Sequence, residues 1–170
     1  MDINRLAIEI HVAAISKGFW DVPNAEECAI ACMHAEISEA VQADRLGMPL
    51  IDIERDDGKP EGVGVELADF CMRLMDYCAE KQVPLSTLLV SGNDSSSLTH
   101  LACKLHRYLE RMLDKPVNRR SQRIQIAEYS DYMLSTVADW ISGHGGNLVD
   151  LIYTKMEYNK TRPALHGRKY

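Results

Sequence analysis

Long apolar runs are missing from this sequence of 170 residues. No segment approaches the roughly 18 consecutive apolar residues that a membrane-spanning helix needs. The N-terminal stretch MDINRLAIEI also lacks the basic-then-apolar order of a signal peptide. We therefore expect no membrane partner and a cytoplasmic location.

An excess of basic residues is missing as well, because the net charge is −6. General nucleic-acid binding requires a basic surface, so we expect no nucleic-acid partner. Pairing motifs of cysteine are also absent: the number of cysteines is odd and no Cys-x-x-Cys occurs. Each cysteine has apolar neighbours in a segment with a helical pattern. We expect all five to be reduced and buried, namely Cys28, Cys32, Cys71, Cys78 and Cys103.

Alternation of apolar and polar residues with a period of two is absent over any useful length, so we predict no β-sheet. Apolar residues recur instead at helical spacing, and Leu, Ile, Val, Met and Ala are plentiful while aromatics make up only 6%. We predict an all-α protein, a single domain over residues 1–170 that forms an antiparallel bundle of about six helices. The helices are expected over about 2–18, 24–46, 63–81, 97–116, 120–141 and 147–159.

Local signals mark several of these boundaries. Asp2 is an expected N-cap, and Asn24 followed by Glu27 fits a capping box. A serine of SGNDSSS is expected to cap the fourth helix, and Pro116 to close it. Residues 50–62 are acidic and contain Gly and Pro, so we predict a mobile loop there.

Acidic residues three positions apart project from the same face of a helix and can share a metal ion. Random placement of 25 acidic residues gives about 3.6 such pairs. The spacing alone is therefore uninformative, because the sequence has four: Glu36/Glu39, Glu54/Asp57, Glu66/Asp69 and Glu128/Asp131.

Position on the helical wheel separates these pairs. Glu36 falls among alanines, and Glu66 falls beside Phe70 and Tyr77. Burying an unpaired carboxylate costs several kcal/mol. Glu39 lies at the margin of the wheel sector that holds Glu36, and Asp69 lies at the edge of the sector that holds Glu66. Two inward-leaning pairs on adjacent helices would repel each other unless a cation lay between them, and all-oxygen ligands favour Mg²⁺ or Mn²⁺ over zinc. The competing interpretation is a set of surface acids paired with Lys or Arg.

The other two pairs are weaker candidates. Glu54 and Asp57 lie in the Gly- and Pro-containing loop and are most simply solvated. Glu128 faces the polar side of its helix, whereas Asp131 lies near apolar residues and stays a weak extra candidate.

The C-terminal segment 155–170, KMEYNKTRPALHGRKY, carries a net charge of +4, so the other 154 residues carry −10. Such an end is often only a solvated tail. This segment is not of low complexity, however, and its guanidinium and ammonium groups suit phosphate oxygens. If the acids hold Mg²⁺, a basic clamp beside them indicates a polyphosphate that bridges the two.

These motifs together resemble a known family. HAEISEA followed by ELAD, with 26 residues between Glu39 and Glu66, is similar to the Glu-x-x-Glu and Glu-x-x-Asp signature of the MazG-like all-α nucleotide pyrophosphohydrolases. YNKTRPALHGRK resembles the tail of that superfamily, and KGFWD resembles its segment before the first acidic helix. The resemblance covers residues 17–69 and 155–169, while residues 83–150 contribute no signature. Ala35 departs from the pattern, since many members have a further Glu there.

The resemblance implies a four-helix core, a homo-oligomer, and Mg²⁺-dependent hydrolysis of a nucleoside triphosphate to the monophosphate and pyrophosphate. Abundant Leu, Met and Ile on six short helices indicate a dimer or tetramer, and the all-oxygen ligands also suit Mn²⁺. The resemblance also implies roles for twelve residues. The metal ligands and catalytic carboxylates would be Glu36, Glu39, Glu66 and Asp69. The phosphate-binding groups would be Lys155, Asn159, Lys160 and Arg162, followed by His166 and Lys169, with Lys17 and Trp20 facing the nucleotide.

On this hypothesis the metal polarises the α-phosphate and helps to deprotonate a water, which Glu39 orients as general base. Lys160 and Arg162 offset the charge on the leaving pyrophosphate. Two alternatives remain open. The same scaffold could act on another pyrophosphate, such as a phosphoribosyl-nucleotide or dUTP. The chain could also be a non-catalytic helical module for oligomerisation or nucleotide sensing.

Overall fold

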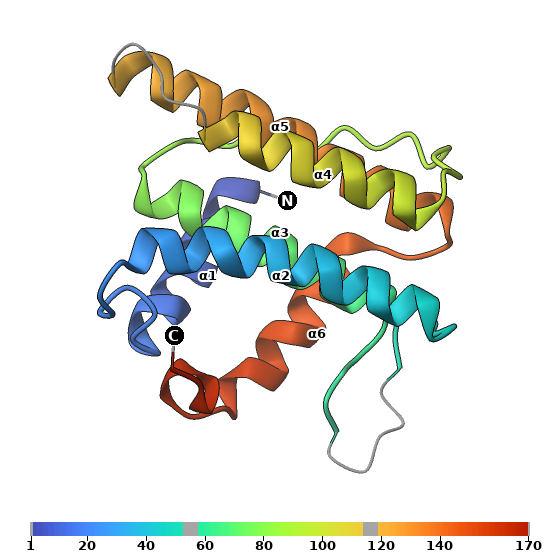
Figure 1. The fold of residues 1–170 in the computed structure, drawn as a ribbon, viewed down its shortest axis with the longest axis horizontal. Helices are drawn as coiled ribbons and strands as arrows, with labels where there is room; N and C mark the ends of the chain where they lie inside the picture. Colours follow the sequence, from blue (N-terminus) through green and yellow to red (C-terminus); the bar gives the residue numbers. More distant parts are fainter. Residues whose placement is uncertain (1, 53–57, 114–118, 170) are drawn as a thin grey trace.

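The computed structural model describes residues 2–52, 58–113 and 119–169, and these form an all-α bundle, as predicted (Figure 1). Within the described residues there is no β-strand, only one isolated bridge between Asp52 and Glu61. The helices are α1 (Ile3–Ser16), α2 (Ala25–Arg45), α3 (Val63–Glu80), α4 (Leu98–Leu113), α5 (Arg119–Gly143) and α6 (Leu148–Lys160), followed by the short 3₁₀ turn η1 (Ala164–Gly167).

Helix α3 is the centre of the bundle. Two-thirds of its residues are buried, and it packs against α1, α2, α5 and α6. Helices α4 and α5 form an antiparallel pair on one side of the molecule, whereas α6 and the C-terminal turn lie on the other side (Figure 1). Because α2 packs along α3, the two acidic pairs that the sequence singled out belong to neighbouring helices.

Two of the predicted helix caps are present and one prediction is wrong. The Asp2 side chain accepts hydrogen bonds from the backbone N–H groups of Asn4 and Arg5. Ser97 Oγ accepts one from the N–H of His100 at the start of α4. Asn24, in contrast, has the left-handed φ of 57°, and its side chain makes no cap hydrogen bond. The capping box fails because this backbone conformation turns the side chain away from the first turn of α2.

Backbone hydrogen bonds join the two ends of the segment between α2 and α3. The N–H and C=O groups of Asp52 and Glu61 exchange hydrogen bonds of 2.7 and 2.9 Å. Gly62 then begins α3 with a φ of 126°, and a Cβ atom there would lie 2.5 Å from the carbonyl oxygen of Pro49. Only glycine fits this close approach, which fixes where α3 starts. Glu54 and Asp57, and the predicted helix-closing Pro116, lie outside the described residues.

The prediction that all five cysteines are buried is wrong for three of them. Cys71 and Cys78 are buried in α3, Cys28 and Cys32 are partly exposed on α2, and Cys103 is exposed on α4. All five are free thiols, as expected. Cys28 and Cys32 border the cavity described below and not the packed core, whereas Cys103 lies on an exposed part of α4.

Residues 84–97 run without a helix beside α5, and polar side chains of α5 hold them. Asp131 accepts a hydrogen bond from the N–H of Ser86 at 2.7 Å, and Asp139 accepts from the N–H groups of Ser91 and Gly92, both at 2.6 Å. Asp131 therefore anchors this segment and is removed from the metal candidates. No helix in the described ranges is long and apolar enough to cross a membrane.

Candidate functional site

The predicted site residues converge on one cavity of about 410 Å³, which α1, α2, α3, α6 and the C-terminal turn surround. Its lining contains eleven of the twelve residues: Lys17, Trp20, Glu36, Glu39, Glu66, Asp69, Lys155, Asn159, Lys160, Arg162 and His166. The exception is Lys169, which is exposed and does not line the cavity.

Three carboxylates form the acidic half of the cavity. One oxygen from each of Glu36, Glu39 and Glu66 lies within 4.8 Å of the other two. Two oxygens bound to the same Mg²⁺ lie at most about 4.2 Å apart, since each Mg–O distance is about 2.1 Å. Small side-chain rotations would therefore bring the three into one coordination sphere. Asp69 lies beside this group but is engaged with Lys155.

Burial raises the pKa of two of these acids. The pKa of Glu66 is raised to about 7, first by its burial and then by the negative charges of Asp69 and Glu36, while Lys155 acts in the opposite direction. Burial also raises the pKa of Glu36, in spite of the neighbouring Arg73. A cation among these carboxylates would favour their ionised forms.

Two basic side chains already neutralise two of the four carboxylates that the sequence predicted as metal ligands. Nε of Arg73 lies 2.6 Å from Oε1 of Glu36. Nζ of Lys155 lies 2.7 Å from Oδ2 of Asp69, and this lysine is almost fully buried, with 3% of its side chain exposed. The competing interpretation of the sequence, acids paired with Arg or Lys, is thus correct for these two carboxylates.

Glu39 and Glu66 are different, since neither makes a hydrogen bond or ion pair within the part of the chain that the structure describes. Glu39 is exposed at the mouth of the cavity, whereas Glu66 is buried, with 7% of its surface accessible. A divalent ion would therefore meet one open carboxylate and one buried carboxylate that lack partners.

The C-terminal segment folds back over the cavity and forms its basic half. Lys17 at the end of α1 secures it: its ammonium donates to the backbone carbonyls of Lys160 and Arg162, and its own carbonyl accepts from the N–H of Leu165 at 2.8 Å. Lys17 thus holds the tail in place. The side chain of Lys160 is largely exposed and pairs with Glu157.

His166 sits within this basic half in a strained conformation, with a left-handed φ of 52°. Its ring packs edge-on against Phe19, with the ring centroids 5.0 Å apart. Burial, together with the positive charges of Arg162 and Arg73, lowers the pKa of His166 to about 4. The ring is therefore neutral at pH 7 and offers the cavity a hydrogen-bonding group without adding charge.

Asn159 adds a polar atom that has no hydrogen-bond partner among the described residues. Its Oδ1 atom is buried and accepts no hydrogen bond from any described residue. A buried polar atom without a partner is costly unless water or a ligand satisfies it. Asn159 is one of the residues that line the cavity, although its Oδ1 atom is itself covered by protein.

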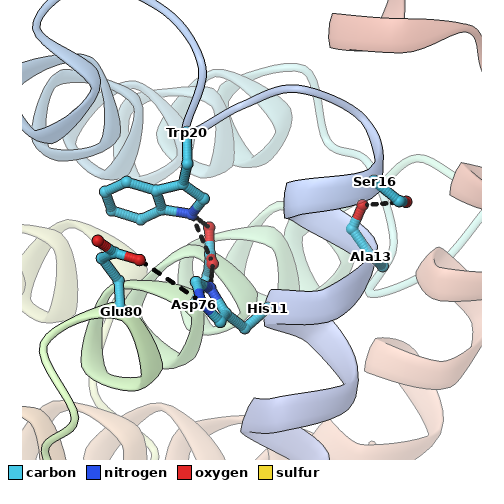
Figure 2. A network of polar contacts seen from close by, with 6 residues as sticks. All are labelled: His11, Ala13, Ser16, Trp20, Asp76 and Glu80. Carbon is cyan, nitrogen blue, oxygen red and sulfur yellow. Dashed lines mark hydrogen bonds and ion pairs between the residues drawn. The ribbon is translucent and has the colours of Figure 1, made fainter.

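Trp20 lines the same cavity, and a network of polar contacts holds its side chain in place (Figure 2). Its indole N–H donates to the Asp76 carboxylate at 3.0 Å, and His11 Nδ1 lies 2.7 Å from the same oxygen. His11 Nε2 in turn approaches Glu80 at 3.5 Å. This network fixes the plane of the indole, and burial raises the pKa of Asp76.

Sequence reasoning missed Arg73, Asp76, Phe19 and Arg168, all of which line the cavity. A signal for two of them was present. Arg73 and Asp76 follow Asp69 by four and seven positions, so they continue the inward face of the acidic pair along α3. Phe19 and Arg168 lie in connecting segments, where no periodicity indicates direction.

The side chains present fit a hard divalent cation. The three clustered groups all offer carboxylate oxygens, and two of them have a raised pKa. Asn159, whose buried amide oxygen has no partner among the described residues, lines the same cavity. No protein-family model, curated protein or solved structure matches this chain.

Proposed function

We propose that this chain is a Mg²⁺-dependent pyrophosphohydrolase that cleaves a nucleoside triphosphate to the monophosphate and pyrophosphate. The resemblance of its motifs to the MazG-like enzymes suggested this reaction. The observation that supports it most is that an acidic cluster and a basic clamp, from opposite ends of the sequence, line one cavity of about 410 Å³.

This combination is what a metal-bound polyphosphate requires. Phosphate chains carry several negative charges and bind guanidinium and ammonium groups, while the metal needs anionic oxygens on its other side. A purely structural acidic cluster would be expected to face solvent or to be fully paired with bases. Glu66 does neither, since it is buried and has no ion pair or hydrogen bond among the described residues. Asn159, whose buried Oδ1 has no partner among those residues, lines the same cavity.

The residues that line the cavity have separate roles in this proposal. When bound, Mg²⁺ would supply positive charge at the α-phosphate and lower the pKa of a coordinated water. Glu36, Glu39 and Glu66 would hold the ion. The exposed Glu39, if not fully engaged with the metal, would accept a proton from the attacking water. Arg162 and Lys160 would bind the departing pyrophosphate, and Trp20 offers an indole plane to the base.

The direct test is a panel of ribo- and deoxyribonucleoside triphosphates with Mg²⁺, in which pyrophosphate and orthophosphate are measured separately. We expect pyrophosphate and the nucleoside monophosphate in equal amounts, and no product in the presence of a chelator. Release of orthophosphate alone would contradict cleavage at the α-phosphate.

A non-catalytic nucleotide sensor is the second candidate, and the pairing of Glu36 with Arg73 and of Asp69 with Lys155 favours it. These ion pairs neutralise two of the four carboxylates without a metal ion. Nucleotide with Mg²⁺ would then raise the melting temperature without any product appearing. A phosphoribosyl-nucleotide or dUTP as substrate belongs in the same panel.

We also propose that the chain forms a homo-oligomer. Ile8, Val12 and Ile15 form a stripe on the outer face of α1, and between 48% and 60% of each is exposed. A contiguous apolar stripe of this kind is typical of a contact surface. Light scattering coupled to gel filtration would measure the mass directly.

A further inference from the structure

We propose that Arg73 is an exchangeable counter-ion: it neutralises Glu36 in the metal-free protein, releases that carboxylate to the incoming divalent ion, and then binds the phosphate chain. This inference rests on the proposed function. It assigns to Arg73 a role that couples metal binding to substrate binding in the same cavity.

The contact between Arg73 and Glu36 has the features of a replaceable partner. It is a single hydrogen bond, from Nε to Oε1, and not a two-pronged interaction through both Nη groups. The Nη groups make no hydrogen bond or ion pair within the described part of the chain. The four N–H donors of the two Nη groups therefore remain available, and phosphate oxygens are suitable acceptors.

The exposure of the two basic partners separates their roles. Arg73 lines the cavity with 26% of its side chain exposed, whereas Lys155 has only 3% exposed. Removing Lys155 from Asp69 would leave two buried charges unpaired, which is costly. The guanidinium of Arg73 can instead rotate toward the open cavity, so Arg73 is the partner that can exchange.

Arg73 also lies where the two halves of the cavity meet. Its guanidinium carbon is 6.0 Å from the centroid of the Phe19 ring, and that ring packs against His166 in the basic tail. A rotation away from Glu36 would therefore carry the guanidinium toward the groups that the proposed function assigns to the polyphosphate. Its positive charge would then act on substrate and no longer on the metal ligand.

The proposal predicts opposite effects on two affinities. In Arg73→Met, a divalent ion no longer competes with the guanidinium for Glu36, so the variant should bind metal alone more tightly. An increase of roughly tenfold corresponds to one charge-assisted hydrogen bond that need not be broken. The same variant should bind a triphosphate more weakly, since a phosphate contact is lost.

The experiment is a titration at about pH 8 in which free Mn²⁺ is followed by electron paramagnetic resonance. A second titration, in saturating Mn²⁺, uses a nucleoside triphosphate with an imido group between the α and β phosphorus atoms, followed by calorimetry. Arg107→Met removes an exposed arginine of α4 that does not line the cavity and serves as the matched control. Arg73→Met should tighten Mn²⁺ binding and weaken analogue binding, and the control should change neither.

The outcomes are distinguishable. If the wild-type chain binds Mn²⁺ but Arg73→Met binds it equally or less tightly, the exchange is wrong while the proposed function stands. If the wild-type chain binds no Mn²⁺, the proposed function fails and this inference with it. Should Arg73→Met not fold, Arg73→Lys keeps the charge without the planar fork: loss of analogue affinity with near-normal Mn²⁺ affinity supports the phosphate contact, and unchanged analogue affinity overturns it.

Discussion

Replacing Glu66 by glutamine should stabilise the metal-free protein above neutral pH while removing its response to metal. Glu66 has 7% of its surface exposed and no ion pair with a described residue. Its pKa is raised from an ordinary 4.5 to about 7, mainly by burial. The folded protein therefore holds a proton between pH 4.5 and 7 that the unfolded chain has released.

The sign and size follow from proton linkage. Because the folded state binds more protons in this window, its free energy of unfolding falls as the pH rises from 4.5 to 7. A pKa difference between 4.5 and about 7 corresponds to roughly 3 kcal/mol, at 1.36 kcal/mol for each tenfold change. Glutamine has nearly the same shape and stays neutral, so the free energy of unfolding of the variant should not fall by this amount as the pH rises.

Urea unfolding followed by circular dichroism, with a chelator present, measures the effect at several values between about pH 4.5 and 8.5. Glu66→Gln should match the wild type at the acidic end and exceed it by about 3 kcal/mol at the alkaline end. Adding Mg²⁺ should stabilise the wild type but not the variant. Glu128→Gln, at an exposed position of α5, is the control. The reasoning is refuted if Glu66→Gln shows the same pH dependence as the wild type.

Three further predictions concern other parts of the molecule. Glu36→Ala should abolish pyrophosphate release while the helical circular dichroism stays intact, and a normal turnover number would remove Glu36 from the mechanism. Lys155→Met should lower the free energy of unfolding of the metal-free protein by roughly 3–5 kcal/mol, because Asp69 is left uncompensated. Adding Asp69→Asn should recover most of this loss, and no recovery in urea unfolding would contradict the pairing. Val12→Asp should reduce the mass measured by light scattering at concentrations where the wild type is oligomeric, and an unchanged mass would exclude the outer face of α1 as the contact.

The helical fold could be predicted because each helix carries its own signal. Leu98, Leu101 and Leu105 repeat on one face of α4, and Asp2 marks the start of α1 by a side-chain cap that forms as predicted. Asn24 shows where such reasoning ends. Its left-handed φ of 57° depends on how the chain enters from the preceding turn, which a four-residue motif does not encode.

The sequence predicted which residues line the cavity better than it predicted which of them pair with one another. The wheel placed Glu36 and Glu66 inward, and both are buried. The partners of the acids could not be predicted in the same way, because Lys155 lies 86 positions after Asp69 in the sequence and meets it only through the packing of α6 on α3. Two explanations were open for the four acids, a divalent ion between them or pairing with Lys and Arg, and in the structure Arg73 and Lys155 neutralise two of the four.

With two acids paired to bases, the carboxylate that still needs an explanation is that of Glu66. The two paired carboxylates would be tolerated in any structural protein, since each has its own counter-ion. Glu66 is the costly one, buried and without an ion pair or hydrogen bond among the described residues, and its neighbours Glu36 and Asp69 add to the cost. A hydrophobic residue at this position would stabilise the bundle more. A buried acid that weakens the fold is the arrangement expected where binding and not stability determines the side chain. The same cavity is lined by Asn159, whose Oδ1 has no partner among the described residues, and by the strained His166.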